Sequence, residues 1–318
     1  MSVKDSNIHR YRFRAELLHP GCWPTWIALG IYFLFTLLLP MAVIDFAGSR
    51  LGEYAANKNR KRFNIARVNL RLCFPEKSEQ TINAMVLDHF RAQLRSAMHL
   101  FIVWWRPVFM VRRRIVREGF EQIDFYKNQG KQVIVLLCHS VGLDFAVASV
   151  SMDYNTNGPY KPMRNKVIDF MFSHGRIRFG AKFGGKLFTR QDGLRPLIRE
   201  TRAGKVLVYL ADEDLGLENS VFVPFFGVPK ATISVLGRLT KACDAVVLPC
   251  VSCYDPEIKK YRIKMLPALQ DFPKGDDETD SAAMNRAIEK TVLECPEQYL
   301  WTFRYFQTRP EGEAPVYD

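Results

Sequence analysis

The chain has 318 residues, of which 48% are hydrophobic, so it is long and apolar enough to bury the core of one large domain. Its formal charge of +12 calls for an acidic partner, such as nucleic acid, anionic lipid or an acidic protein. The sequence contains no recognisable glycine-aromatic nucleic-acid module, so we predict membrane lipid and an acidic protein as partners, and no nucleic acid.

The N-terminal region contains an uncharged stretch of the length that crosses a membrane. Residues 1–22 are polar, and the stretch from Trp23 to Ile44 then contains no charged residue. Roughly 20 apolar residues match the thickness of a bilayer core, and Trp23 and Trp26 are typical interfacial residues. A cleaved signal peptide is the alternative, but the run is long for one and no Ala-x-Ala pattern follows. We therefore predict a retained single-pass anchor over residues 23–44.

Basic residues flank both ends of this anchor, and the heavier cluster follows it. That cluster comprises Arg50, Lys58, Arg60, Lys61 and Arg62. Lysine and arginine are enriched on the cytoplasmic side of membrane spans, so we expect the rest of the chain to lie in the cytoplasm. Residues 45–125 are expected to form a helical, membrane-proximal part.

Two segments within residues 45–125 have patterns that predict their structure. Apolar residues recur at helical spacing from Ser78 to about Val103, which predicts a helix with Ser78 as its N-cap. The next segment, Trp104 to Arg114, is aromatic and apolar and ends in three arginines. It suits equally a helix lying on a membrane surface and a core helix that emerges into solvent.

From residue 126 the pattern alternates between short apolar runs and helical periods. This alternation predicts an α/β fold, with a sheet flanked by helices, over residues 126–318. The expected strands are 133–137, 186–189, 206–210, 245–249 and 261–266, and the expected helices are 145–150, 194–202, 233–242 and 282–293.

His139 follows the predicted buried strand Val133–Leu137 directly. Ligands of open α/β sheets bind beyond the carboxyl ends of strands, so this position favours a functional role. Asp144 lies five positions later, and Gly142 permits the chain to turn between them. We expect the Asp144 carboxylate to accept a hydrogen bond from the imidazole and so orient a general base. A histidine that only caps the helix or fills the loop is the alternative.

The seven cysteines are scattered without a paired framework, which favours reduced thiols in the cytoplasm. Cys250 and Cys253 would face opposite sides of a strand, so we expect neither a metal site nor a redox pair there. Cys138 should face away from its neighbour His139, as a buried structural cysteine.

Sequence blocks downstream of His139 complete a family pattern. They are Tyr160-Lys-Pro-Met-Arg164-Asn165, Arg176-x-Arg178-Phe-Gly180, Arg190-x-Asp192-Gly193-Leu-Arg195, Ala211-Asp212-Glu213-Asp214-x-Gly216 and Phe222-Val-Pro224-Phe-Phe-Gly227-Val-Pro-Lys-Ala-Thr232. The His139-x4-Asp144 pair resembles the signature of glycerolipid and lysophospholipid acyltransferases. The blocks narrow this resemblance to the lipid A late (secondary) acyltransferases of Gram-negative bacteria. The resemblance runs from about residue 23 to residue 306 and implies a glycerolipid-acyltransferase-like mixed sheet with an N-terminal transmembrane helix.

The resemblance implies a reaction as well as a fold. A fatty acyl chain would pass from acyl carrier protein to a hydroxyl of a Kdo-bearing lipid A precursor at the inner membrane, with no cofactor. Because the chain lacks a Gly-x-Ser-x-Gly elbow, we expect the lipid hydroxyl to attack directly, activated by His139. The alternatives are a glycerophospholipid acyltransferase using acyl-CoA or acyl carrier protein, and a non-catalytic protein that binds anionic lipid.

Charged residues of the blocks are the expected substrate-binding groups. A guanidinium suits a phosphate or a developing oxyanion, and the family motif implies such a role for Arg164. Lys161 stands where the family usually has arginine, which keeps the charge but loses the bidentate geometry. Further expected groups are Arg176, Arg190, Asp192, Arg195, Asp212 and Asp214.

Two other features of the blocks are less specific. Asp212 and Asp214 make only half a metal site, so we predict no metal and interpret both as partners for the arginines. The Phe222–Gly227 block is expected to form an apolar loop beside the site, or ordinary core packing. Phe303 and Tyr305 replace the histidine and arginine of the family's C-terminal pattern, Trp-x-His-Arg-Arg-Phe.

Overall fold

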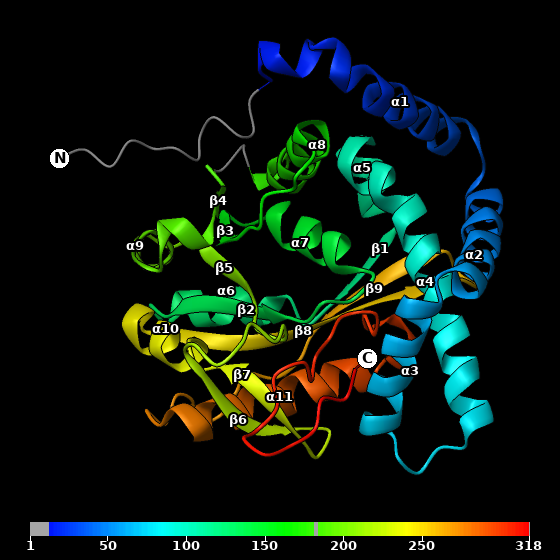
Figure 1. The fold of residues 1–318 in the computed structure, drawn as a ribbon. Helices are drawn as coiled ribbons and strands as arrows, with labels where there is room; N and C mark the ends of the chain where they lie inside the picture. The colour runs from blue at the N-terminus through cyan, green and yellow to red at the C-terminus, as the bar shows by residue number, and fades with distance from the viewer. Residues whose placement is uncertain (1–12, 181–183, 318) are drawn as a thin grey trace.

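A computed structural model describes residues 13–180 and 184–317 of the chain, and its centre is one mixed sheet with the strand order β1-β9-β8-β2-β5-β3-β4 (Figure 1). The strands are β1 (Ile115–Glu118), β2 (Gln132–Leu137), β3 (Thr156–Pro159), β4 (Lys186–Phe188), β5 (Val206–Leu210), β8 (Ala245–Asp255) and β9 (Lys260–Met265). β8, β2, β5, β3 and β4 run parallel, and β9 runs antiparallel to β8, with β1 parallel to β9. The predicted α/β class and mixed sheet are confirmed.

Helices account for most of the remaining regular structure. They are α1 (Trp23–Leu38), α2 (Met41–Lys58), α3 (Arg60–Cys73), α4 (Glu79–Trp105), α5 (Val108–Arg112), α6 (Glu121–Asn128), α7 (Leu143–Ser151), α8 (Lys166–Ile177), α9 (Arg195–Arg202), α10 (Leu236–Cys243) and α11 (Asp277–Leu293). The α4 helix begins as predicted, because the Ser78 hydroxyl accepts a hydrogen bond from the Thr81 N–H at 3.2 Å. Short 3₁₀ turns are η1 (Ala15–Leu18), η2 (Pro20–Cys22), η4 (Arg190–Asp192) and η5 (Pro296–Gln298).

The central strand β2 is buried on both of its faces. Val135 and Leu137 pack in the core that contains α7, whereas Ile134 and Leu136 pack in the core that contains α10 and α11. Figure 1 shows α7 and α11 on opposite sides of the sheet. A strand covered on both faces reads as a continuous apolar run, which is why the sequence predicted it. Cys138 is buried in the α11 core, as expected for a structural cysteine.

The block expected to be an apolar loop is instead a β-hairpin. β6 (Ser220–Phe225) pairs antiparallel with β7 (Val228–Ile233), and the connecting Phe226 and Gly227 have φ of 49° and 77°. Positive φ at both turn positions matches the twist of a tight hairpin. Pro224 and Pro229 face each other across the pair, and proline inside a strand argues against a strand assignment. The prolines therefore concealed the hairpin in the sequence.

The predicted anchor over residues 23–44 is interrupted. α1 ends at Leu38, Pro40 follows in an extended conformation, and Ile44 belongs to α2 and is buried in the core. Among the residues that the structure describes, one helical stretch, Pro20–Leu38, is long and apolar enough to cross a membrane by length and composition. One side of α1 packs on the protein, and the other side exposes large apolar residues. These are Trp23, Ile27, Ile31, Leu34 and Leu38, each more than half exposed.

The segment from Trp104 to Arg114 runs from a buried position to exposed ones. Trp104 is buried at the end of α4, as in a core helix. Val108 and Phe109 of α5 are 42% and 57% exposed, so the segment leaves the core there, and contact with a membrane surface stays a prediction.

Candidate active site

His139 and Asp212 meet at the carboxyl ends of two adjacent strands. The backbone N–H of His139 donates to Asp212 Oδ2 at 2.7 Å, and Nδ1 hydrogen-bonds Asp212 Oδ1 at 2.6 Å. β2 and β5 are parallel, with Leu137 opposite Leu210. His139 and Asp212 each lie two residues past that register pair, so the sheet itself brings them together.

The predicted hydrogen bond between Asp144 and His139 is wrong. Asp144 lies in the first turn of α7, as expected, but its carboxylate accepts from Arg176 Nε at 2.7 Å and from Nη2 at 3.3 Å. Asp212 occupies the Nδ1 side of the imidazole in its place. The physical reason is that strand register brings Asp212 to His139, whereas the turn into α7 directs Asp144 towards α8.

Gly142 is required for a reason other than the one expected. Its φ is −88°, so the turn needs no left-handed residue. A Cβ there would instead lie 2.4 Å from Ser252 Oγ, and that hydroxyl donates to the Gly142 carbonyl at 2.7 Å. The loop after His139 therefore packs directly on β8, where no side chain fits.

The electrostatics of the pair suit a base and its orienting acid. Burial lowers the pKa of His139, but the charge of Asp212, its hydrogen bond and the charge of Glu213 outweigh burial, so the pKa is raised above 6.5. Arg176 opposes this rise. Burial raises the pKa of Asp212, but His139 and then Lys230 reverse that effect, so the pKa lies below 3.8. Asp212 is therefore ionised at neutral pH and accepts a proton-bearing Nδ1, which leaves Nε2 with its lone pair.

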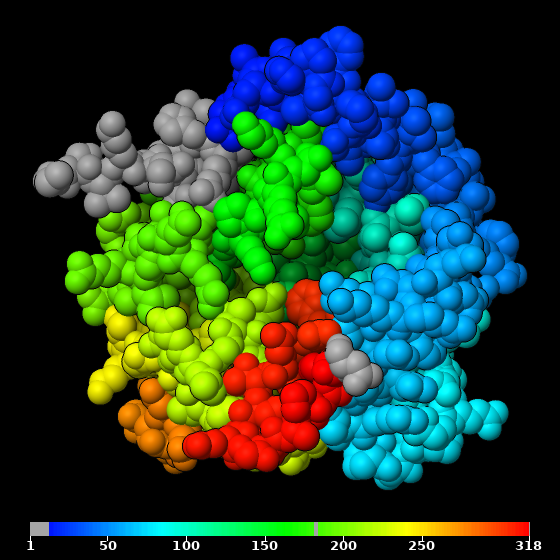
Figure 2. Space-filling model, viewed as in Figure 1, coloured from blue at the N-terminus to red at the C-terminus, as the bar shows by residue number. Residues whose placement is uncertain are grey.

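Nε2 has no hydrogen-bond partner within residues 13–180 and 184–317. The side chain of His139 is 19% exposed, and Nε2 lies 3.6 Å from Glu213 Oε1, beyond hydrogen-bond distance. The ring of Phe303 lies 5.1 Å from the imidazole, centroid to centroid. Figure 2 shows a hollow in this face of the molecule, between α8 in green and the C-terminal segment, residues 296–317, in red.

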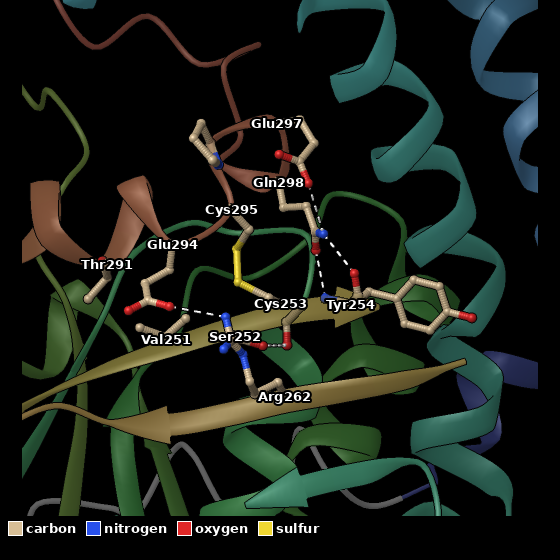
Figure 3. The surroundings of a disulfide bond; sticks show 12 residues. Val251, Ser252, Cys253, Tyr254, Arg262, Thr291, Glu294, Cys295, Glu297 and Gln298 are labelled. Carbon is tan, nitrogen blue, oxygen red and sulfur yellow. Dashed lines mark hydrogen bonds and ion pairs between the residues drawn. A yellow bond between two sulfur atoms is a disulfide. The ribbon is translucent and has the colours of Figure 1, made fainter. Parts of the chain in front are cut away.

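The C-terminal segment supports the backbone around His139. Leu300 N–H donates to the His139 carbonyl at 2.8 Å, and Val141 N–H donates to the Gln298 carbonyl at 2.8 Å. Gln298 is fixed in turn, because its side chain accepts from Tyr254 N–H at 2.7 Å and donates to the Tyr254 carbonyl at 2.8 Å (Figure 3).

A disulfide joins the same two segments, which corrects the expectation of unpaired cysteines. Cys253 on β8 is bonded to Cys295, just before η5 (Figure 3). Cys250, three residues before Cys253, is a buried free thiol. The bond and the Gln298 hydrogen bonds together attach the strand next to β2 to the segment that contacts His139.

The other expected substrate-binding residues divide into two groups. Lys161 and Arg164 are exposed in the loop between β3 and α8, and Arg190 is exposed just after β4. None of these three side chains has a hydrogen-bond partner within residues 13–180 and 184–317. Because β3 and β4 are parallel to β2 and β5, these cations follow the same edge of the sheet as His139. Arg195, at the start of α9, is exposed as well.

The acidic residues of the blocks are used differently from the expectation. Neither Asp212 nor Asp214 binds an arginine side chain within the described part of the chain. Asp214 accepts from the Thr308 N–H and hydroxyl at 2.6 and 2.8 Å, so it attaches the C-terminal segment. Asp192 Oδ2 accepts from the Thr189 N–H and hydroxyl, both at 2.7 Å, and so stabilises the turn that carries Arg190.

Comparisons with known proteins show the family of the chain. The profile of the bacterial lipid A biosynthesis acyltransferases matches residues 10–308. The chain is 34% identical over 310 residues to a lipid A biosynthesis lauroyltransferase of Escherichia coli K12, covering 96% of this chain and 98% of the relative. It is 33% identical over 308 residues to a lipid A biosynthesis acyltransferase of Haemophilus influenzae (96% and 94% covered). It is 32% identical over 316 residues to the myristoyltransferase of E. coli K12 (99% and 96% covered). The chain therefore belongs to the bacterial lipid A biosynthesis acyltransferase family.

Proposed function

We propose that this acyltransferase moves a fatty acyl chain from acyl carrier protein to a hydroxyl of a Kdo-bearing lipid A precursor, with His139 as the general base. The relatives named above act in lipid A biosynthesis, which supports a glycolipid acceptor over a glycerophospholipid. The formal charge of +12 suits two acidic substrates, the carrier protein and the phosphorylated glycolipid.

One observation carries the assignment of the base. Asp212 is 1% exposed and accepts hydrogen bonds from both the backbone N–H and Nδ1 of His139, which fixes the ring and its tautomer. Nε2 is then free to take the proton of the attacking hydroxyl. General-base catalysis of this kind contributes about 10² to 10⁴ in rate.

The transfer proceeds by direct attack. The lipid hydroxyl gives its proton to Nε2 as its oxygen bonds to the thioester carbonyl carbon, and the carbonyl oxygen becomes an oxyanion. When the oxyanion collapses, the C–S bond breaks and the phosphopantetheine thiolate takes the proton back from the imidazolium. No covalent acyl-enzyme forms, and the proton count is balanced over the two steps.

Arg176 is the cation we assign to the oxyanion. Its guanidinium is fixed by two hydrogen bonds to Asp144, and its charge acts on His139. A preorganised cation beside the reacting carbonyl stabilises charge that develops in the transition state. We therefore assign Asp144 the role of positioning Arg176. We assign the exposed Lys161, Arg164 and Arg190 to the phosphates of the substrates.

Our proposal for localisation is attachment to the inner membrane through α1, with the catalytic part on the cytoplasmic side. The exposed apolar side of α1 and the basic cluster that follows it support this arrangement. The Cys253–Cys295 bond weighs against the cytoplasmic side, because thiols there are kept reduced.

The experiment is an assay of the purified protein in detergent, with acyl-carrier-protein thioesters and a Kdo-lipid A precursor, read by mass spectrometry. We expect His139→Ala to lower kcat/KM by about 10² to 10⁴ while binding of the lipid is retained. The exposed His19→Ala is the matched control and should be unchanged. Wild-type turnover in the His139 variant would refute the base assignment. Turnover only with acyl-CoA and a lysophospholipid would favour the glycerophospholipid alternative.

A further inference from the structure

Lys230 is a buried lysine beside the site whose ammonium is unpaired. It lies on β7, its side chain is 0% exposed, and Nζ has no hydrogen-bond partner within residues 13–180 and 184–317. The ring of Phe225, on the adjacent strand β6, lies 5.7 Å from Nζ. The block from Phe222 to Thr232 contains this lysine, but the sequence does not show that it is buried, and neither the fold nor the substrate-binding loops account for it.

A buried ammonium without hydrogen bonds is costly. Removing a lysine charge from water costs several kcal/mol unless nearby charges and hydrogen bonds offset it. A methionine of similar volume would fill the same space without that penalty. A lysine at this position therefore points to a use for its charge.

The charges that act on Lys230 come from the loop after β5. They belong to the carboxylates of Asp212, Asp214 and Glu213. Asp214 already accepts two hydrogen bonds from Thr308 and one from Gly216. Asp212 differs, because it is buried and its hydrogen-bond partner, His139, is an uncharged base before the reaction starts. Asp212 is thus a buried negative charge that needs a compensating cation.

We propose that Lys230 is a positioning residue for acyl transfer: its buried ammonium balances the charge of Asp212, so that Asp212 remains an ionised acceptor for His139 Nδ1 while the imidazole stays neutral. This inference rests on the proposed role of His139. Lys230, on the β6–β7 hairpin, thus acts together with His139 and Asp212, which follow β2 and β5.

The electrostatics agree in sign with this role. Burial lowers the pKa of Lys230 to about 8, even though Asp212, Asp214 and Glu213 raise it against that effect. The lysine is therefore mostly charged at neutral pH, and it lowers the pKa of Asp212. Without this cation, the negative charge of Asp212 would be less well compensated. The pKa of Asp212 and the pKa of His139 would then both rise. Two other charges act on the imidazole, Glu213 from the loop after β5 and Arg176 from α8, and neither is replaced in a Lys230 variant.

The test is the pH–rate profile of Lys230→Met and Lys230→Gln in the same acyl-transfer assay, with the exposed Lys241→Met as the matched control. We expect kcat to fall at least tenfold at pH 7 with KM changed less than threefold. The acid limb should move to higher pH, because His139 is protonated more readily. Thermal stability should be equal or higher, since a desolvated charge has been removed. A purely structural lysine would instead lower stability and leave the acid limb in place.

Wild-type kcat and an unmoved acid limb in both variants would overturn the role of Lys230, and so would a failure of both variants to fold. Lys230→Arg keeps the charge, so its acid limb should match that of wild type even if its size slows turnover. If His139→Ala retains activity in the same assay, the proposed base fails instead, which distinguishes the two proposals.

Discussion

The loops after β2 and β5 start at the same edge of the sheet, but the carboxylates that they carry have different partners. In the loop after β2, Asp144 lies five residues from His139 but binds Arg176. In the loop after β5, Asp212 is distant in sequence and yet makes both hydrogen bonds to His139. Register between the parallel strands β2 and β5, rather than spacing along the chain, therefore determines which carboxylate binds His139.

The largest effect that we expect is a loss of kcat when the Asp212 carboxylate is replaced. Asp212→Asn keeps the size of the side chain but removes the charge that stabilises the imidazolium and fixes the tautomer, so we expect kcat to fall by about 10² to 10⁴. Asp144→Asn is the matched variant in the other loop. It leaves the His139 contacts intact and loosens Arg176, so its loss should be smaller, about 10- to 100-fold. Kinetics on both variants at saturating substrate measure this order, and the reverse order would make Asp144 the orienting acid.

A smaller effect is expected where the C-terminal segment supports His139. Cys295→Ser removes the bond to Cys253, so the unfolding free energy in detergent and urea should fall by about 2–4 kcal/mol relative to the oxidised protein. kcat should change only a few-fold, because the hydrogen bonds of Gln298 and Leu300 remain. Cys22→Ser, at a free and partly exposed cysteine, is the control.

The same bond tests which side of the membrane the catalytic part occupies. Alkylation of thiols in intact cells before purification should find Cys253 and Cys295 free if the domain lies in the reducing cytoplasm. A fully bonded pair under those conditions would contradict the cytoplasmic placement.

Continuous apolar runs and apolar residues at helical spacing were sufficient to predict much of the fold. The buried run of β2 and the amphipathic helix that begins after Ser78 were both predicted, because burial alone dictates those patterns. The hairpin β6–β7 was missed, because two prolines paired across it read as a loop. The break at Pro40 was missed as well, since Met41 and Ile44 are as apolar as the residues of α1 although they pack in the protein core.

The candidate site was only partly predictable. The position of His139 past a strand end was read correctly, because the edge of an α/β sheet is marked by the strand itself. Its partner required the knowledge that β5 lies beside β2 with Leu210 opposite Leu137, which is a tertiary fact. One signal was present in the sequence, since His139 and Asp212 both follow an apolar run by two residues. Lys230 lies within the block from Phe222 to Thr232, but the sequence assigned it no role, because only its burial distinguishes it from a solvated lysine.

Titration of His139, followed by ¹⁵N NMR of histidine-labelled protein in wild type, Asp212→Asn and Asp144→Asn, tests whether Asp212 is the acid that orients the base. Because Asp212 raises the pKa of His139 above its ordinary value, the neutral form active as a base should appear as the pH rises through this raised pKa. In Asp212→Asn the pKa should fall and the Nδ1–H tautomer should lose its dominance, whereas in Asp144→Asn the tautomer should be preserved. An unchanged titration in Asp212→Asn, with the shift in Asp144→Asn instead, would contradict the account.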